Sequence, residues 1–139
     1  MTIYFQKYIQ RADLKANPDT LYVFGDNMER RGYGGQAKEM RGEPNAVGIP
    51  TKVSPSMASS AFLTDDMFHT WMSEAKPDFD RITEHPKVIW PYDGIGSGRA
   101  RLRTSAPKIL TCINNFLSLE LRERGNLEWN NKGLWKERA

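Results

Sequence analysis

Two glycine-rich segments of the chain carry residues that could bind a phosphate-bearing ligand. The first segment, residues 24–52, contains Gly25-Asp26-Asn27, Gly32-Tyr33-Gly34-Gly35-Gln36 and, at its end, Thr51-Lys52. The second segment, residues 91–99, contains Asp93-Gly94-Ile95-Gly96-Ser97-Gly98-Arg99. Glycine allows positive φ angles and lets a ligand approach main-chain N–H groups closely. Because each segment follows an apolar run, the pattern predicts a small phosphate-bearing molecule bound at the edge of a sheet.

The polar residues early in the first segment have two interpretations. The Asp26 carboxylate can accept hydrogen bonds from an exocyclic amine or a ribose hydroxyl, and the Asn27 amide can donate and accept. Alternatively, both side chains bond their own backbone in a turn. The run from Gly32 to Gly35 leads into a predicted helix, whose first N–H groups favour an anion.

Lys52 directly follows a predicted buried strand. Its amine can pair with a phosphate or, once desolvated, attack the C1 carbon of a sugar. The charge of Arg99 or Arg101 would favour the neutral, nucleophilic amine, and Asp93 is the predicted proton carrier. The alternative is a solvent-facing lysine at the end of a strand.

The elements that must position these residues follow from hydrophobic patterning. Strands are predicted at residues 2–8, 20–24, 46–49 and 87–90, the first as an edge strand and the others as buried strands. Helices are predicted at residues 12–16 and 35–40, after Thr64, and after Thr104 or Ser105 with Pro107 in the first turn. Strands that alternate with helices indicate an α/β fold. Ligands bind such sheets beyond the carboxyl ends of the strands, where both glycine segments fall.

Composition limits the other classes of protein. The 139 residues are predicted to form one domain, residues 1–139, with a core at about residues 18–122. Residues 125–139 form either a small appendage or an interaction surface. No apolar run is long enough to span a bilayer and the N-terminus is no signal peptide, so we expect a cytoplasmic protein with no membrane partner. Cys112 falls on the apolar face of a predicted helix and is expected to be a buried hydrophobe.

The charge pattern fits an anionic ligand, with a formal net charge of +3 and a sequence pI of about 9.1. Basic residues cluster beside both glycine segments, either for phosphate recognition or as a solvated surface: Arg30, Arg31, Lys38, Arg41, Arg99, Arg101 and Arg103. Neither a P-loop nor the dinucleotide-binding fingerprint is present. His69 and His85 lie far apart without a cysteine–histidine cluster, so no metal site and no cofactor are predicted.

Through these motifs the chain resembles an ADP-ribose-binding macro domain over roughly residues 18–122. The likeness is greatest to the subgroup that includes terminal ADP-ribose glycohydrolases. Its shared features are a strand ending in Gly25-Asp26, a glycine-rich helix start followed by Ala37, a strand ending in Thr51-Lys52, and a later Gly-x-Gly loop. Residues 25–52 also look like a group of small, largely uncharacterised phage and bacterial proteins.

The resemblance implies a three-layer α/β/α fold with a central mixed sheet. Asp26 would then contact the adenine, the amides after Gly34 and Gly35 would wrap the diphosphate, and residues 94–98 would close over phosphate and distal ribose. In the glycohydrolase subgroup the lysine of the Thr-Lys pair attacks the ribose, and Lys52 matches it. The assisting aspartate after Gly-x-Gly has no match, since Asp93 precedes the loop. Asn45 is the one candidate for the asparagine of hydrolytic members.

The sequence therefore predicts a protein that binds ADP-ribose or a related nucleotide, with hydrolysis of an ADP-ribosyl bond as an open question. The alternatives are a non-catalytic binder of a nucleotide signal and a nucleic-acid-associated protein. An ADP-ribosylated protein or nucleic acid is a further candidate partner. Catalysis is assigned to Lys52 and Asp93. The predicted ligand-binding residues are Asp26, Asn27, Gly32, Tyr33, Gly34, Gly35, Gln36, Asn45, Thr51, Gly94, Ile95, Gly96, Ser97, Gly98 and Arg99.

Overall fold

The fold is built on one mixed sheet. The computed structural model describes the backbone of residues 2–124, 127–129 and 134–137, and the side chains of residues 3–120. The strands lie in the order β3-β2-β4-β1-β6-β5. Four are parallel, β1 (Thr2–Gln6), β2 (Leu21–Asn27), β3 (Ala46–Lys52) and β4 (Lys87–Pro91). β6 (Leu134–Glu137) and β5 (Leu127–Trp129) join them in antiparallel pairs.

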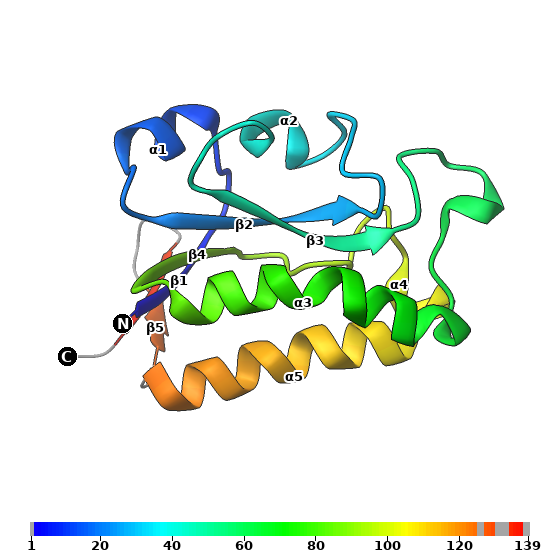
Figure 1. Ribbon diagram of the computed structural model, residues 1–139. Helices are drawn as coiled ribbons and strands as arrows, with labels where there is room; N and C mark the ends of the chain where they lie inside the picture. Colours follow the sequence, from blue (N-terminus) through cyan, green and yellow to red (C-terminus); the bar gives the residue numbers. More distant parts are fainter. Residues whose placement is uncertain (1, 125–126, 130–133, 138–139) are drawn as a thin grey trace.

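Helices cover both faces of the sheet (Figure 1). The helices α1 (Arg11–Ala16) and α2 (Ala37–Met40) lie on one face, and α3 (Phe68–Glu84) and α5 (Pro107–Arg124) lie on the other. The short elements η1 (Ser59–Ala61), η2 (Asp65–Met67) and α4 (Leu102–Ser105) join the longer ones. This arrangement confirms the predicted α/β class. None of the helices in the described part of the chain combines the length and apolar character needed to cross a membrane.

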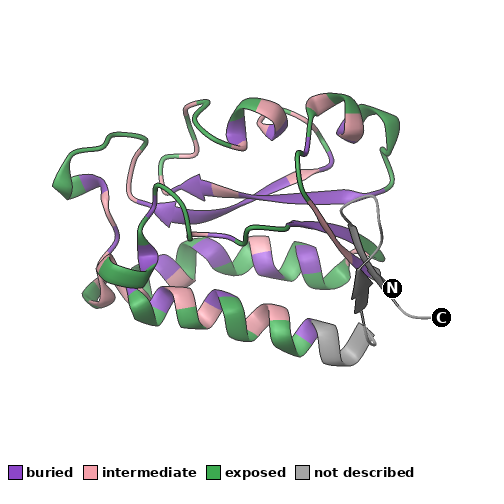
Figure 2. Ribbon diagram, turned by 180° about the vertical axis from the view of Figure 1, so that it is seen from behind, coloured by how far each residue is buried: buried purple, intermediate pink, exposed green. Residues whose placement is uncertain are grey.

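The side chains of β2 alternate between two hydrophobic cores, because successive residues of a strand point to opposite faces. Leu21 and Val23 pack into the core that includes α3 and α5. Tyr22 and Phe24 pack into the smaller core with residues of α1 and α2. Figure 2 accordingly shows the central strands as buried between helical layers whose outer surfaces are exposed. Burial on both faces is the usual state of a parallel sheet.

Three strand predictions need correction. β1 was expected at an edge, but it has β4 on one side and β6 on the other. The neighbour β6 comes from residues 125–139, whose role the sequence left undecided and of which residues 125–126, 130–133 and 138–139 lie outside the described part. β2 does not stop at Gly25, because Gly25 and Asp26 remain paired with Ile49 and Pro50. β3 likewise continues to Lys52.

The last predicted helix is α5, but its predicted cap is wrong, because a separate short helix, α4, precedes it. The hydroxyls of Thr104 and Ser105 both donate to the carbonyl of Arg101, at 3.0 Å, and belong to α4 rather than to a cap of α5. Pro107 is the first residue of α5, as predicted. Cys112 on this helix is half-buried against the larger core, and burial raises the pKa of its thiol.

The connections after the strands open a crevice at the carboxyl edge of the sheet. The chain leaves β2 toward α2 on one face, whereas it leaves β3 and β4 toward α3 and α4 on the other (Figure 1). Because β2 lies between β3 and β4, the loops that follow these neighbouring strands diverge. Open α/β sheets bind their ligands at such a divergence.

Candidate ligand site

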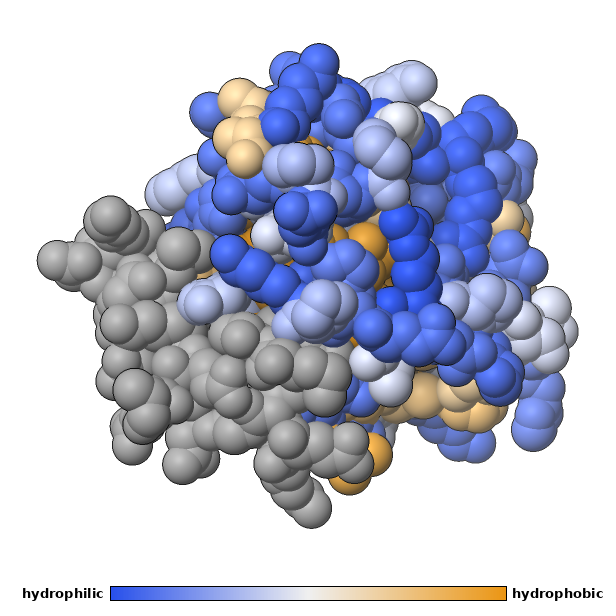
Figure 3. Space-filling model, turned by 60° about the vertical axis from the view of Figure 1, so that its left-hand side comes forward, coloured by the Kyte–Doolittle hydropathy of each residue, from blue (hydrophilic) through white to orange (hydrophobic). Residues whose placement is uncertain are grey.

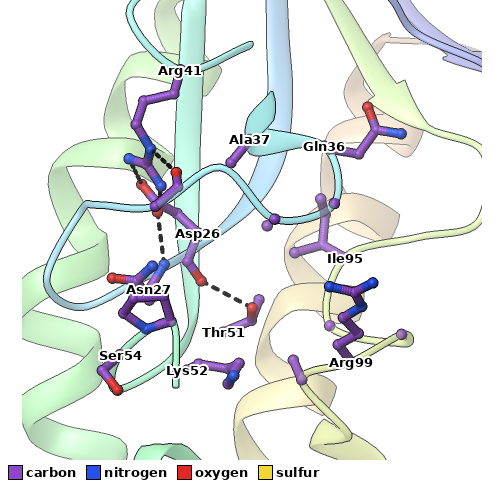
Figure 4. A pocket seen from close by; sticks show the side chains of 18 of the residues that line it. Asp26, Asn27, Gln36, Ala37, Arg41, Thr51, Lys52, Ser54, Ile95 and Arg99 are labelled. Carbon is purple, nitrogen blue, oxygen red and sulfur yellow. Dashed lines mark hydrogen bonds and ion pairs between the residues drawn. The ribbon is translucent and has the colours of Figure 1, made fainter. Parts of the chain in front are cut away.

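A cavity of about 430 Å³ lies at the carboxyl ends of β2, β3 and β4. Its walls come from both glycine segments, which are remote in the sequence and meet only in the fold (Figure 4). We call residues 28–36 the first glycine loop and residues 92–101 the second glycine loop. The volume falls in the range of roughly 300–1,000 Å³ that is typical of small-molecule sites.

Most of the predicted site residues line this cavity. They are Asp26, Asn27, Gly32, Gly34, Gly35, Gln36, Thr51, Lys52, Gly94, Ile95, Gly96, Gly98 and Arg99. Arg31 and Arg41, which the sequence offered either for phosphate recognition or as a solvated surface, also line the cavity. No ligand role was predicted for the remaining lining residues: Gly25, Ala37, Ser54, Pro55, Met57, Pro91 and Ala100.

Four predicted residues lie outside the cavity lining. Asn45 precedes β3, at the opposite end of that strand from Lys52, and its buried amide donates 3.0 Å bonds to three main-chain carbonyls. Tyr33 and Asp93 are exposed. Ser97 is also exposed, and its hydroxyl donates to the Asp93 carbonyl at 2.6 Å. The fold therefore uses Asn45 and Ser97 for local structure.

Asp26 is buried in an ion pair. Its side chain is only 3% exposed and accepts two hydrogen bonds from the Arg41 guanidinium, one of them, from Nη1, at 3.2 Å. The amide of Asn27 donates to the same carboxylate at 2.8 Å. Gly48 on β3 makes room for it, since a Cβ there would lie 2.6 Å from Asp26 Oδ2. The carboxylate oxygens are thus already occupied by groups of the protein.

Arg41 joins this pair to the first glycine loop. Its Nε donates to the Gly32 carbonyl at 2.7 Å, and its Nη2 donates to the Arg31 carbonyl at 3.3 Å. The guanidinium also lies 5.6 Å from the centre of the Phe24 ring. The sequence placed Arg41 only among the surrounding basic residues. The available signal was Asp26 itself, because a carboxylate at the end of a buried strand requires a nearby cation.

Asn27 makes the contacts of a turn. Its Oδ1 accepts from the Glu29 amide at 3.0 Å, and its Nδ2 donates to the Arg31 carbonyl at 2.7 Å. The Asn27 amide also donates to the Asp26 carboxylate. Local bonds of this kind are those of the turn that the sequence analysis gave as the alternative to ligand binding. Asp26 and Asn27 line the cavity while shaping the loop at its edge.

Lys52 lines the cavity away from Arg41 (Figure 4), and only 8% of Lys52 is exposed. We call the part of the cavity around Lys52 the Lys52 end and the part around Asp26 and Arg41 the Asp26 end. Its amine donates to the Ser56 carbonyl, contacts Met57 Sδ at 3.5 Å and lies 5.0 Å from the centre of the Phe62 ring. Burial lowers the pKa of Lys52, and the positive charges of Arg99 and Arg101 lower it further. These are the two causes that the nucleophile hypothesis requires.

Two hydrogen bonds hold the end of β3 that precedes Lys52. The Thr51 hydroxyl donates to the Asp26 carbonyl at 3.0 Å, and the Trp71 indole N–H donates to the Pro50 carbonyl at 2.7 Å. Both bonds are buried. The end of β3 that presents Lys52 is therefore held against both β2 and α3.

Gly96 and Gly34 differ in backbone conformation and in the room that they leave for a side chain. Gly96 has a φ of +85°, and a Cβ on it would lie 2.3 Å from Leu102 Cδ1 in the core. Gly34 does not adopt a positive φ, and the nearest atom to a Cβ there is Arg99 Nη1 at 3.7 Å. Gly96 is thus required by packing, whereas at Gly34 a Cβ would make only an ordinary contact with Arg99 of the other loop.

The cavity lining is predominantly cationic. Its charged residues are one acid and four basic residues: Asp26, Arg31, Arg41, Lys52 and Arg99. Because Arg41 neutralises Asp26, the remaining charge is positive and favours an anion. Among the described residues, no group of three or more His, Cys, Asp and Glu side chains could hold a metal ion.

Comparison with known proteins assigns the chain to a family. It belongs to a family of unknown function, DUF7831, whose model matches residues 4–116. That range includes every residue of the cavity lining. No curated protein and no solved structure was found to match the chain.

Proposed function

We propose that the cavity binds ADP-ribose or a related nucleotide derivative. The observation that carries this proposal is the convergence of two remote glycine loops on one cationic cavity beyond three parallel strands. Helices on both faces of a mixed sheet are compatible with the three-layer macro-domain architecture, which belongs to the proposal.

In this proposal the phosphates lie between the two glycine loops. Glycine at positions 34 and 35 allows a diphosphate to approach the main-chain N–H groups, and Arg99 faces Gly34 across the gap. The base and ribose occupy the remaining wall, to which Ile95 contributes a buried apolar side chain. Asp26 supports the wall through Arg41, and we assign it no direct contact with the base.

Hydrolysis of an ADP-ribosyl bond by Lys52 is a second candidate function, favoured by the lowered pKa of its amine. The neutral amine attacks C1 of the ribose, the bond from C1 to the leaving group breaks, and the leaving group takes a proton. The product is an N-glycosyl lysine; the bond from C1 to the ring oxygen then breaks, the ring oxygen takes the proton that the lysine nitrogen loses, and the imine of the opened ribose forms. Water hydrolyses this imine, which releases the sugar and regenerates the lysine. Asp93 is exposed beside the lining residue Gly94 and delivers the proton from the solvent side in this hypothesis.

Thermal-shift and calorimetric titrations with ADP-ribose, AMP and adenosine test the binding proposal. A ligand at about 100 times its dissociation constant stabilises the folded state by roughly 2.7 kcal/mol. We expect a rise in melting temperature with ADP-ribose and less or none with adenosine, which lacks phosphate. Absence of heat and of any thermal shift at millimolar ADP-ribose contradicts the proposal. Strongly salt-dependent binding of oligonucleotides alone supports the nucleic-acid alternative instead.

Turnover of an ADP-ribosylated protein by the parent and by Lys52→Ala separates the enzyme from the binder. Borohydride trapping of a sugar adduct on Lys52 supports the nucleophile hypothesis. Equal turnover in both proteins excludes Lys52 as the nucleophile. Binding without turnover in the parent makes the protein a binder of this substrate.

A further inference from the structure

We infer that the Lys52 end of the cavity is a subsite for a phosphate monoester, held by Lys52, Arg99 and Arg101. The inference rests on the proposed nucleotide-binding function and specifies a part of the ligand: a phosphate group with one ester bond, in addition to any bridging diphosphate.

Three cations converge at this end. The Lys52 amine and the Arg101 guanidinium both lie against the ring of Phe62, at 5.0 Å and 5.5 Å from its centre. Arg99 lines the cavity, and its Nη1 lies 3.7 Å from the position that a Cβ on Gly34 would take, while Figure 4 shows its side chain on the opposite side from Asp26 and Arg41. Arg99 and Arg101 are both close enough to Lys52 to lower the pKa of its amine.

No carboxylate balances these charges within the described side chains. The other arginines around the first glycine loop have acidic partners: Arg30 pairs with Asp78 at 2.6 Å and Arg31 with Glu29 at 3.0 Å. Ion pairs of this kind are absent from the three cations among residues 3–120. Of the three, only Lys52 is buried, and a buried charge is costly unless it is paired, so an anion bound here would stabilise the Lys52 ammonium and would also reach the exposed Arg99 and Arg101.

Unused hydrogen-bond donors at the Lys52 end also favour a bound anion. An ammonium group has three donors, and the partners of the Lys52 amine are one carbonyl and a weakly accepting thioether. The guanidinium groups of Arg99 and Arg101 make no side-chain hydrogen bond within the described residues, and each presents a fork suited to two phosphate oxygens.

A phosphate monoester fits this set better than a bridging phosphate does. It carries about −1.5 to −2 charges near neutral pH and offers three terminal oxygens, so it can meet several cations at once. A bridging phosphate carries about one charge and offers fewer free oxygens. The main-chain N–H groups of the glycine loops suit the bridging phosphate instead.

Calorimetric titration with ribose 5-phosphate, ribose and inorganic phosphate, at pH 7.5 and low salt, tests the subsite. We expect ribose 5-phosphate and phosphate to bind and ribose to give no heat. Arg99→Gln and Arg101→Gln should each weaken the binding of ribose 5-phosphate about tenfold, the change expected for one charge-assisted hydrogen bond. Both side chains are exposed, and thermal melting of each variant checks that it is folded.

Arg103→Gln is the matched control. Arg103 is an exposed arginine of α4, and its loss changes the net charge by the same amount. Neither Arg101 nor Arg103 belongs to the cavity lining, but Arg101 lies against the Phe62 ring that Lys52 also contacts. It should change the affinity less than about twofold if contact rather than general attraction holds the phosphate. Equal weakening in all three variants, or no weakening in any, overturns the subsite.

The same titrations with ADP-ribose separate the two proposals. If ADP-ribose fails to bind while ribose 5-phosphate binds with the expected dependence on Arg99, the proposed function is wrong and the subsite stands. If ADP-ribose binds but ribose 5-phosphate and phosphate give no heat, the subsite is overturned and the proposed function stands.

Discussion

The two ends of the cavity handle charge in opposite ways. At the Asp26 end, a buried carboxylate and Arg41 neutralise each other, and Arg41 uses its remaining donors on the carbonyls of the first glycine loop. At the Lys52 end, Arg99 and Arg101 add positive charge to a buried amine, and no carboxylate of the described side chains pairs with them. The first arrangement completes the structure of the loop, whereas the second leaves positive charge without an acidic partner among the described residues, which is the basis of the proposed anion site.

The cations at the Lys52 end also distinguish the cavity from the surface shown in Figure 3. The face shown in Figure 3 is mainly hydrophilic, with hydrophobic residues in small separate groups. A net charge of +3 spread over such a surface gives little selectivity for any partner. We therefore attribute the proposed selectivity to the three cations Lys52, Arg99 and Arg101, which have no acidic partner among the described residues.

The largest expected effect is at the Asp26 end. Arg41→Ala should destabilise the protein by about 3–5 kcal/mol, because it removes the guanidinium that is hydrogen-bonded to a buried carboxylate and leaves only the longer ion pair with Arg30, at 3.9 Å. Urea denaturation measures this loss directly. Arg31→Ala is the control: Arg31 pairs with Glu29 at the surface, and its loss should change stability by no more than about 1 kcal/mol. Similar stabilities for the two variants would contradict the structural role of Arg41.

A smaller effect is expected at the second glycine loop. Gly96→Ala should cost about 1–3 kcal/mol, since its Cβ would overlap Leu102 in the core and its φ is positive. Gly34→Ala should leave stability nearly unchanged, because its Cβ meets nothing closer than 3.7 Å. Denaturation of both variants tests this. Gly34→Val is then the clean probe of ligand entry, and unchanged ADP-ribose affinity in that variant would mean that the ligand does not pass between the loops.

The smallest change in stability, and one of opposite sign, is expected at the Lys52 end. Lys52→Met should leave the free protein at least as stable at pH 7, because it removes a desolvated, repelled charge, while ribose 5-phosphate binds about tenfold more weakly. The pKa of Lys52 lies below its ordinary 10.5 in the folded state. The unfolded state therefore binds more protons, and the stability of the parent rises with pH between the lowered pKa and 10.5.

The pH dependence supplies the check. Urea denaturation of the parent and of Lys52→Met between pH 7 and 10 should show a stability difference that shrinks as pH rises. Binding of ribose 5-phosphate by the parent should weaken over the same range, because the amine loses its charge. Catalysis by the neutral amine would have the opposite trend and strengthen with pH. A constant stability difference would contradict the environment described for Lys52.

Much of the sheet and of the cavity could be predicted from local sequence. Short apolar runs that end in glycine, as at Phe24-Gly25, mark buried parallel strands, and both glycine loops fall at their carboxyl ends. That is why residues as distant as Gly34 and Gly96 could be assigned to one site. The position of β1 could not be predicted, because its second neighbour comes from the polar C-terminal residues and pairing between distant strands has no local signal.

The hydrogen-bond and ion-pair partners of polar side chains could not be predicted from the sequence either. Asp26 was predicted to contact a base, but its ion pair depends on Arg41, which follows a helix of four residues. Asn45 was assigned to the ligand, yet it caps three carbonyls at the far end of β3. A polar residue at a strand end is consistent with a site or with structure. The fold places Asn45 away from the cavity, whereas Asp26 lines it and its contact with a ligand stays a prediction.

Titration of the isotope-labelled chain with ADP-ribose, followed by amide NMR shifts, tests the proposed site most directly. We predict saturable shifts concentrated at the amides of residues 34–36 and 94–99, with Arg103 and the outer face of α5 unaffected. Arg99→Gln should weaken the binding and keep the same pattern of shifts. No shifts at millimolar ADP-ribose, or shifts centred on Arg103 and the outer face of α5 instead of the glycine loops, would contradict a nucleotide site in this cavity.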